Sequence, residues 1–279
     1  MPPFITLTTD FGTRDYYAAL VKGAILSATV GTDTPVQIID VTHEIPPYDI
    51  VAAAFAVKHV YTSFPKGTIH IVAVDSFYGG HLRFVAARAE GYFFLAPDNG
   101  VLSLILERDA DELAILELPN PATAFPIKDV LANAIRHLCT SPELRLFAEI
   151  GMPVNDIVRR ISIQPVVRHD SIRGVVTHID NYQNAITNIH RTTVERVAHG
   201  RVSSLYFKRH SPIVGIHHYY SDVAIGEMLC LFNSAGFLEI AIHLDKAAML
   251  LELAPDDPVQ LIFDGGVGQG ALFNDKRMN

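Results

Sequence analysis

The 279-residue sequence has no tryptophan and only two cysteines, and just 19% of its residues are charged. It also lacks a basic excess: 22 Lys and Arg stand against 30 Asp and Glu, and the net charge of −8 argues against nucleic acid or an anionic membrane as a partner. The longest apolar run, residues 50–57, is too short to span a membrane. Residues 1–4 lack the basic and apolar regions of a signal peptide. We therefore expect a soluble, cytoplasmic protein.

The chain is rich in hydrophobic residues, at 49%, which predicts a sizeable core and not a disordered chain. Its length suits one large domain or, more comfortably, two. Cys139 and Cys230 stand in apolar surroundings, and we expect both to be small core residues.

Thirteen histidines raise the question of a metal site, but their spacing does not favour one. His217 and His218 are adjacent, so on a strand they would point to opposite faces. His43-Glu44 precedes two prolines and is more typical of a turn than of a ligand pair. We expect neither a metal nor another cofactor. The sequence also has no Gly-x-Ser-x-Gly elbow and no Walker loop.

The opening stretch predicts the first unit of an α/β sheet. Residues 4–9 are β-branched and apolar, which suits a buried strand, and Gly12 allows a sharp turn after Asp10. Asp15 is a plausible N-cap for a helix with apolar residues between 18 and 26. Ligands in such sheets bind beyond the carboxyl ends of the strands, where Asp10 could accept hydrogen bonds from two ribose hydroxyls. From this stretch alone, an aspartate that only bonds local backbone N–H groups is the favoured interpretation.

Strands and helices alternate over residues 1–163 and predict an α/β N-terminal domain with a parallel-rich sheet. A second strand of this sheet ends in a carboxylate, Asp75. Residues 97–100, Pro-Asp-Asn-Gly, form a predicted turn. The predicted strands are 36–41, 68–74, 84–90, 92–96 and 113–118, and the predicted helices are 49–63, 100–107 and 128–140.

The pattern changes after Gln164-Pro165 to short β segments with almost no helical periodicity. We predict a smaller all-β C-terminal domain, a sandwich or a barrel, over residues 168–264. Residues 265–279 begin with a glycine motif that follows a strand, but no helix remains to complete a dinucleotide-binding unit, and we expect a flexible tail. The predicted strands are 172–180, 185–189, 202–207, 227–232, 237–243 and 259–263.

Two C-terminal stretches carry clustered polar side chains. Residues 179–189 combine Asp180 with three asparagines, and residues 232–241 combine Asn233, Ser234 and Glu239. An aspartate beside asparagine and serine could hold the ammonium and carboxylate of an amino acid. The alternative is a pair of polar hairpin turns, and composition leaves both open.

These motifs together resemble the S-adenosylmethionine (SAM) hydroxide adenosyltransferases, the SAM hydrolases that form adenosine and methionine and are related to fluorinase and chlorinase. The resemblance covers about residues 4–263. The matching motifs are Thr9-Asp-Phe-Gly12, Lys22-Gly23, Asp40-Val-Thr-His-Glu-Ile-Pro-Pro47, Pro65-Lys-Gly-Thr68, Pro97-Asp-Asn-Gly100, Asp180 with Asn184, Thr187-Asn-Ile189 and Asn233-Ser-x-Gly-x-Leu-Glu-Ile-Ala241.

The resemblance implies an α/β domain followed by a β-rich domain in a homotrimer. The nucleoside would lie between the N-terminal domain of one subunit and the C-terminal domain of the next. Asp10 would bind the ribose hydroxyls, Tyr220 would pack on adenine, and Asp180 with Asn184 would hold methionine or nearby nucleoside atoms. The implied substrate-binding residues are Asp10, Asp15, Phe125, Asp180, Asn184, Tyr220, Ser234 and Glu239.

The sequence departs from the family at the residues that activate water, an Asp, an Arg and a His. The Asp falls on Asp75, but the Arg falls on Leu82, and Arg83 one place along could replace it after a loop shift. The His falls on Pro126, which has neither donor nor base to offer. His81, in the same loop, is a further candidate, although a surface histidine is the plainer interpretation. We expect Asp75 and Arg83 to be the catalytic pair.

Two functions follow from this pattern. The first is an enzyme that cleaves SAM at C5′ with water or another small nucleophile. The second is a catalytically silent protein that binds SAM or adenosine. The persistence of Asp75 and a nearby arginine favours the enzyme.

Overall fold

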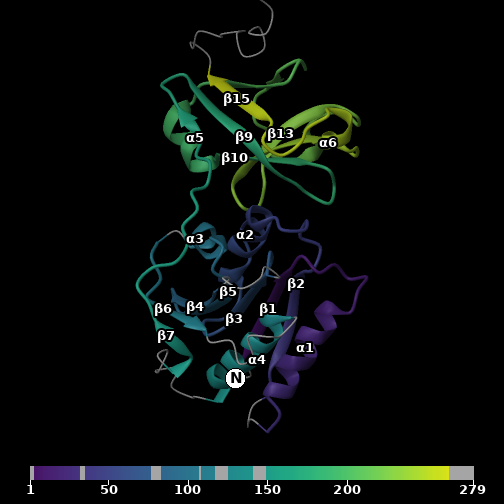
Figure 1. Ribbon diagram of the computed structural model, residues 1–279. Helices are drawn as coiled ribbons and strands as arrows, with labels where there is room; N and C mark the ends of the chain where they lie inside the picture. The colour runs from purple at the N-terminus through teal and green to yellow at the C-terminus, as the bar shows by residue number, and fades with distance from the viewer. Residues whose placement is uncertain are drawn as a thin grey trace, which may run out of the picture. The chain divides into compact units, whose positions relative to one another are not determined.

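The computed structural model describes residues 3–31, 35–76, 83–106, 108–116, 125–140 and 149–263. The chain divides into two compact units, Met1–Ser162 (unit 1) and Ile163–Asn279 (unit 2), and each is described by itself (Figure 1). The predicted two-domain architecture is confirmed. The tail expected at 265–279 lies outside the described residues.

A seven-stranded sheet forms the centre of unit 1, in the order β2-β1-β3-β5-β4-β6-β7. The first three pairs along this order are parallel and the last three are antiparallel. The sheet is therefore mixed, and the prediction of a parallel-rich sheet was wrong for its second half. The strands are β1 Phe4–Thr9, β2 Gln37–Thr42, β3 Ile69–Ala73, β4 Phe84–Ala89, β5 Tyr92–Pro97, β6 Glu112–Leu116 and β7 Gly151–Pro153.

The change from parallel to antiparallel pairing begins at the hairpin between β4 and β5. Only Glu90 and Gly91 connect these strands, with φ of 53° and 82°. Positive φ at both central residues gives the turn twist that matches an antiparallel pair of strands. The two strands were predicted within a residue of their bounds, but their direction was not.

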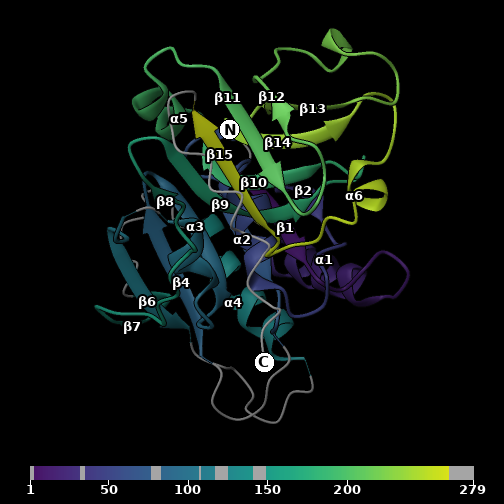
Figure 2. The same ribbon diagram turned by 90° about the horizontal axis from the view of Figure 1, so that it is seen from above.

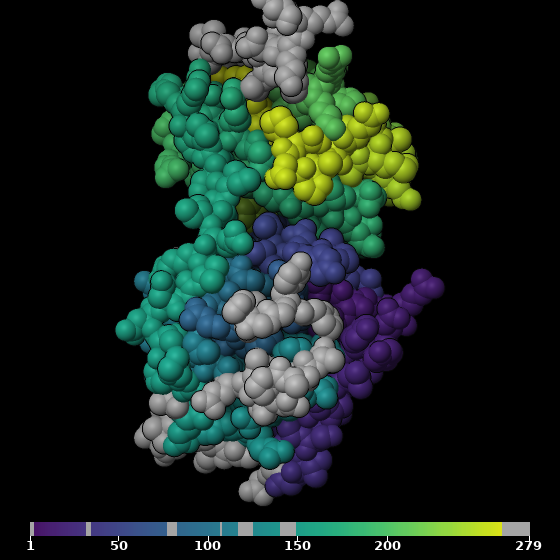
Figure 3. Space-filling view, viewed as in Figure 1, coloured from purple at the N-terminus to yellow at the C-terminus, as the bar shows by residue number. Residues whose placement is uncertain are grey.

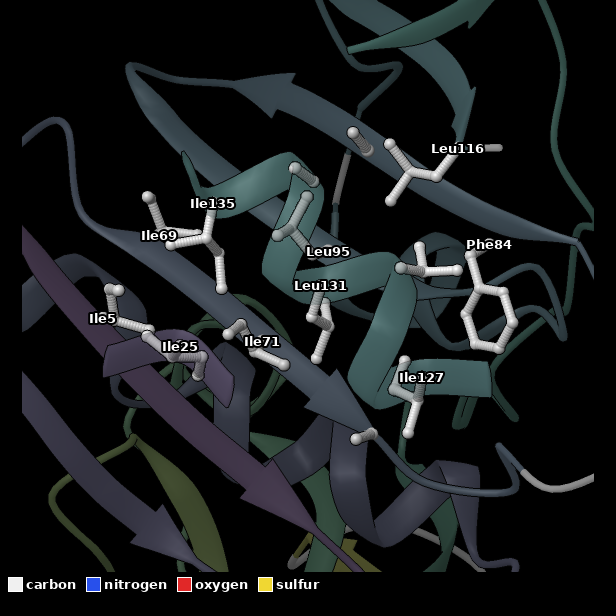
Figure 4. Packing of buried hydrophobic residues seen from close by; sticks show 14 of the residues in the cluster. Ile5, Ile25, Ile69, Ile71, Phe84, Leu95, Leu116, Ile127, Leu131 and Ile135 are labelled. Atoms are coloured by element: carbon white, nitrogen blue, oxygen red, sulfur yellow. The ribbon is translucent and has the colours of Figure 1, made fainter. Parts of the chain in front are cut away.

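Helices cover both faces of this sheet. On one face α1 (Tyr17–Ala28) and α4 (Pro126–Thr140) lie side by side (Figures 1 and 2), and on the other lie α2 (Ile50–Lys58) and α3 (Val101–Ile105). The core under α1 and α4 interleaves Ile25 and Leu131 with Ile5, Ile71 and Leu95 of the strands (Figure 4). Burial of these side chains fixes the sheet and hence the positions of the strand ends.

The first helix starts differently from the prediction, and the second ends earlier than predicted. The N-cap of α1 is Tyr16, which makes no side-chain capping bond, so Asp15 does not cap this helix as predicted. Asp49 does cap α2, because its Oδ1 accepts hydrogen bonds from the N–H groups of Val51 and Ala52 at 3.0 and 2.9 Å. That helix ends at Lys58, and the rest of the predicted 49–63 helix includes a 3-10 turn, Tyr61–Ser63.

The carboxyl ends of β1, β3 and β5 meet at one edge of the unit 1 sheet because these strands are parallel. Asp10, Asp75 and Asp98 follow the three strands at this edge. Since β4 runs the other way, Arg83 at its start lies at the same edge.

Unit 2 is built on an antiparallel sheet in the order β12-β11-β15-β9-β10-β14-β13, with β8 paired to β9. A bridge from His217 to Leu231 joins the segment after β12 to β13, so the sheet nearly closes on itself as a barrel. Figure 2 shows these strands from above. They are β8 Val166–Val167, β9 Ser171–Ile179, β10 Ala185–His190, β11 Ser203–Phe207, β12 Ile213–Val214, β13 Met228–Phe232, β14 Phe237–Ile242 and β15 Pro258–Phe263.

Unit 2 also contains helices, so the prediction of an all-β domain was wrong. α5 (Arg191–Ala198) buries Val194 and Val197, α6 (Ala247–Leu250) is one turn long, and Tyr220–Asp222 form a 3-10 turn. The amphipathic pattern of α5 covers barely two turns, and its second and third residues are threonines, which have low helix propensity.

Candidate active site

Asp10 connects three segments at the strand-end edge of unit 1. Its Oδ2 accepts backbone N–H bonds from Tyr48 at 3.0 Å and from Asp75 at 3.1 Å. Both donors have left-handed backbone, with φ of 66° and 53°, a conformation that costs a residue other than glycine about 1–2 kcal/mol. Within the described part of the chain, Oδ1 of Asp10 accepts no hydrogen bond. Asp10 therefore organises the two loops through Oδ2 alone, while Oδ1 has no partner among the described residues.

Asp75 lies beside Asp10 at the end of β3. Burial, followed by the negative charge of Asp10, raises the pKa of the Asp75 carboxyl. A carboxylate with a raised pKa is a stronger proton acceptor than an ordinary aspartate, which suits it to a bond with water. Ser76, next in the chain, is almost fully buried, and its hydroxyl makes no hydrogen bond within the described residues.

Residues 40–47 form hydrogen bonds with the end of β1 and with the turn that follows it. His43 is buried, its Nδ1 lies 2.8 Å from Thr9 Oγ1, and its Nε2 lies 3.1 Å from Asp40 Oδ1. Glu44 accepts bonds from the backbone N–H and hydroxyl of Thr13 at 2.9 and 2.7 Å. Both residues therefore serve the turn, in agreement with the turn interpretation.

Lys22, from α1, forms an ion pair with Asp40 at 2.6 Å. Burial works to raise the pKa of Asp40, but the bond to Lys22 and the nearby His43 outweigh it and lower that pKa. Two of the sequence motifs shared with the family, at 22–23 and 40–47, thus meet in one contact.

Arg83 is at the predicted edge, but its guanidinium bonds to Asp98. The Asp98 side chain is only 2% exposed, and its other oxygen accepts the N–H of Val158 at 2.7 Å. No contact between Arg83 and Asp75 occurs among the described residues, so a catalytic role for Arg83 remains a prediction. His81 and Leu82 lie outside the described residues.

An aromatic cluster lies beside the Asp10 turn. The ring of Phe125 meets Phe11 and Tyr17 edge to face, with centroids 5.6 and 5.7 Å apart. Asp15 is exposed at the same turn. Pro126 is the first residue of α4, a position that proline favours because no partner is needed for its missing N–H. The position at which the resemblance places a histidine is thus the start of a helix.

A second polar cluster lies in unit 2 and joins the predicted residues Asp180, Asn184, Tyr220 and Glu239. Asp180 Oδ1 accepts the N–H of Asn184 at 2.8 Å, and the Tyr220 hydroxyl donates to Glu239 Oε1 at 2.7 Å. The side chains of Asn184 and Asn233 act to lower the pKa of Glu239, so they lie near its carboxyl group. Residues from β14, from the loop between β9 and β10 and from the 3-10 turn Tyr220–Asp222 thus meet at one place.

The charges of this cluster are perturbed by burial. Glu239 is 2% exposed, and burial together with Asp180 raises its pKa against the lowering effect of its hydrogen bonds. Burial and the bond to Glu239 likewise raise the pKa of the Tyr220 hydroxyl. A buried carboxyl beside amides and an aromatic ring can bind the donor groups of a base or an ammonium.

Ser234 is exposed in the turn between β13 and β14, beside this cluster in sequence but without a described bond to it. Asn233 was named only within a motif, yet its Oδ1 accepts the N–H groups of Ala235 and Phe237 at 3.0 and 3.1 Å and shapes that turn. The Asn-Ser-x-Gly sequence, typical of a turn, was the available signal for its role.

Among the described residues, no group of three His, Cys, Asp or Glu side chains is arranged to hold a metal ion. None of the described helices is long and apolar enough to cross a membrane. Cys230 is buried in the unit 2 core and Cys139 packs against that of unit 1, and burial raises their thiol pKa values to about 12 and about 11.

Comparison with known proteins gives one consistent result. Residues 5–148 match the model of the SAM hydroxide adenosyltransferase N-terminal domain, and residues 174–260 match that of its C-terminal domain. An (R)-S-adenosyl-L-methionine hydrolase of Methanocaldococcus jannaschii is 26% identical over 93% of this chain and 95% of its own length. A fluorinase of an Actinoplanes species is 28% identical over 86% and 90%. A crystal structure of a conserved protein from Thermotoga maritima superposes with a TM-score of 0.81 at 26% identity, over 94% of this chain and all of the other.

Proposed function

Because this chain belongs to the SAM hydroxide adenosyltransferase family, we propose that it cleaves SAM with water to give adenosine and methionine. The observation that carries the proposal is Asp10, whose Oδ2 is fixed by two backbone N–H groups while Oδ1 faces no described donor. A carboxylate held in this way at a strand end suits the paired hydroxyls of a ribose. Curated relatives similar over most of the chain are named (R)-S-adenosyl-L-methionine hydrolases.

The reaction needs an oriented water molecule more than a strong acid. The water oxygen forms a bond to C5′ while the C5′–S bond breaks. The electron pair of the broken bond stays on sulfur, which gives methionine. One proton of the water is lost, and Asp75, with its raised pKa, is the proposed first acceptor before solvent. The sulfonium is already a good leaving group, so we propose that no metal or other cofactor takes part.

The remaining site residues are proposed to bind the two ends of SAM. Asp10 binds the ribose, with Asp15 and the Phe125 ring beside it. Tyr220 and Glu239 contact the adenine. The hydrogen-bonded pair Asp180 and Asn184, with Ser234, binds the methionine part or nearby nucleoside atoms.

We also propose that the protein works as a homotrimer in the cytoplasm, as the resemblance implies. Exposed apolar residues support an association: Leu244, Met249 and Leu250 around α6 are 78%, 61% and 50% exposed. This segment lies at the surface of unit 2, in yellow in Figure 3. Light scattering that shows a stable monomer at working concentration would contradict the trimer.

The decisive experiment is incubation of the purified protein with SAM in water enriched in oxygen-18. Formation of adenosine and methionine, with the label in the 5′-hydroxyl, is the expected result. The matched control is Asp75→Asn, which keeps the size of the side chain and should lose most turnover while still binding adenosine.

Tight adenosine binding without any turnover by the wild type would instead indicate a catalytically silent binding protein. Two points support this second outcome: the resemblance places the family's histidine at Pro126, and the structure shows that Arg83 is bonded to Asp98.

A further inference from the structure

Unit 2 contains a pocket that the proposed reaction does not use. Its volume is about 190 Å³, and it is lined by Arg191, Ile216, His217, His218 and Phe232. Pockets for drug-sized ligands usually measure roughly 300–1,000 Å³, so this one suits a smaller molecule. The lining combines the apolar Ile216 and Phe232 with an arginine and two histidines.

Arg191 supplies the permanent positive charge. It is the first residue of α5, and its guanidinium lies over the Phe232 ring, 4.6 Å from the centroid. No carboxylate among the described residues pairs with it, whereas Arg83, Arg88 and Arg108 each have a carboxylate partner. A guanidinium stacked by its face keeps its N–H edge available for a planar anion.

The two histidines of the lining bond to protein acceptors, which leaves Arg191 as the cation of the pocket. Nδ1 of His217 lies 3.4 Å from the Cys230 carbonyl, which can only accept, so Nδ1 is the nitrogen that carries the proton. Asp222, the first acidic residue after His218 in the sequence, already accepts the N–H groups of His218 and Tyr219 at 2.9 and 3.0 Å.

The pocket lies on the opposite face of the β13–β14 pair from the polar cluster. Leu231 is directly opposite Glu239 in this pair, so their side chains share a face. Phe232 and Leu238 form the next pair and point to the other face, toward the main core of unit 2. A ligand on Phe232 is therefore separate from one that contacts Glu239.

We propose that this pocket binds a small organic carboxylate. The carboxylate bonds to Arg191, and a short apolar body lies against Phe232 and Ile216. Charge and apolar surface are both needed, because an arginine alone would accept any anion, whereas the Phe232 ring and Ile216 favour an anion with a hydrocarbon part.

The test is calorimetric titration of the full chain with butanoate, with the uncharged butanamide as matched ligand. Butanoate should bind saturably and butanamide should not. Arg191→Ala should weaken butanoate binding at least about tenfold, since hydrogen bonds to charged groups contribute this much or more. Arg191 is exposed and its backbone bond to Gly236 survives the change, so the variant should fold. Arg196→Ala, on the same helix, is the control and should bind as the wild type does.

Equal binding by wild type and Arg191→Ala, or none by either up to the solubility limit, would overturn the proposal. Inorganic phosphate that binds more tightly than butanoate with the same dependence on Arg191 would overturn the assignment to carboxylates. SAM cleavage is measured separately, so failure of this proposal leaves the proposed function untouched.

Discussion

Replacing Asp10 tests the centre of the candidate site. In Asp10→Ala, the N–H groups of Tyr48 and Asp75 both lose their acceptor, and each belongs to a residue with left-handed backbone. A bond to a charged group contributes roughly 1.5–3 kcal/mol, and Asp10 is half-buried, so two lost bonds at the lower end cost about 3 kcal/mol of unfolding free energy. That is less than the total stability of an ordinary domain, about 5–15 kcal/mol, so the variant should remain folded.

Two measurements separate the roles of Asp10. Urea denaturation should show the loss of about 3 kcal/mol in Asp10→Ala and about half of it in Asp10→Asn, which keeps one oxygen acceptor. Calorimetry with adenosine should show affinity weakened by about 2 kcal/mol or more in both variants, since the ribose hydroxyls lose a charged acceptor. An unchanged urea midpoint would refute the organising role of Oδ2. Unchanged affinity in a folded Asp10→Ala would refute ribose binding by Oδ1.

Four further predictions follow from the site. Because burial and the charge of Asp10 raise the pKa of Asp75, kcat/KM should fall at low pH with an apparent pKa above the usual aspartate range. In Asp10→Asn this apparent pKa should be lower, and an unchanged value would show that another group titrates. Arg83→Ala should lower the unfolding free energy by about 2–3 kcal/mol in urea melts, because the buried Asp98 loses its cation, and a smaller loss would mean that the pair contributes little. Because the pKa of Glu239 is raised in the folded protein, its contribution to the unfolding free energy is full below the ordinary glutamate pKa and is lost as pH rises through the folded value. Glu239→Gln should therefore make the unfolding free energy from urea melts fall less steeply with pH, and it should weaken adenosine binding. The same dependence of unfolding free energy on pH as in the wild type would contradict this. Dialysis against EDTA should leave adenosine formation unchanged, and a loss that a divalent cation restores would contradict metal-free chemistry.

The position of the unit 1 site could be predicted from sequence because it depends on strand ends. The β-branched run 4–9 and the apolar run 68–74 are strands within a residue or two of the predicted bounds, and two parallel strands place Asp10 and Asp75 at one edge. That Asp10 bonds to Tyr48 and Asp75 with a single oxygen could not be predicted, because it depends on the path of two loops with left-handed residues.

The antiparallel half of the sheet was predictable but missed. Two residues, Glu90 and Gly91, cannot connect parallel strands, which require a crossover of a dozen residues or more. Once β4 and β5 are paired with Phe84 opposite Pro97, Arg83 falls opposite Asp98. The ion pair that now holds Arg83 was therefore implicit in the hairpin. The polar cluster of unit 2 could not be predicted from strand ends or turns. Only the family resemblance indicated that Tyr220 and Glu239 belong to one site.

The pairing of Arg83 with Asp98 changes how catalysis must be tested. Loss of activity in Arg83→Ala would not identify a catalytic cation, because the buried Asp98 would be left unpaired and the edge that carries Asp75 would be disturbed. Asp98→Asn separates the two roles, since it releases the guanidinium while keeping an oxygen to accept the Val158 N–H. If Arg83 stabilises the developing hydroxide, the released side chain should keep or raise kcat, and Arg83→Ala in the Asp98→Asn background should abolish it. If the arginine is only structural, both Asp98→Asn proteins should turn over alike. Activation of the attacking water would then depend on Asp75 and on residues other than Arg83 and Pro126.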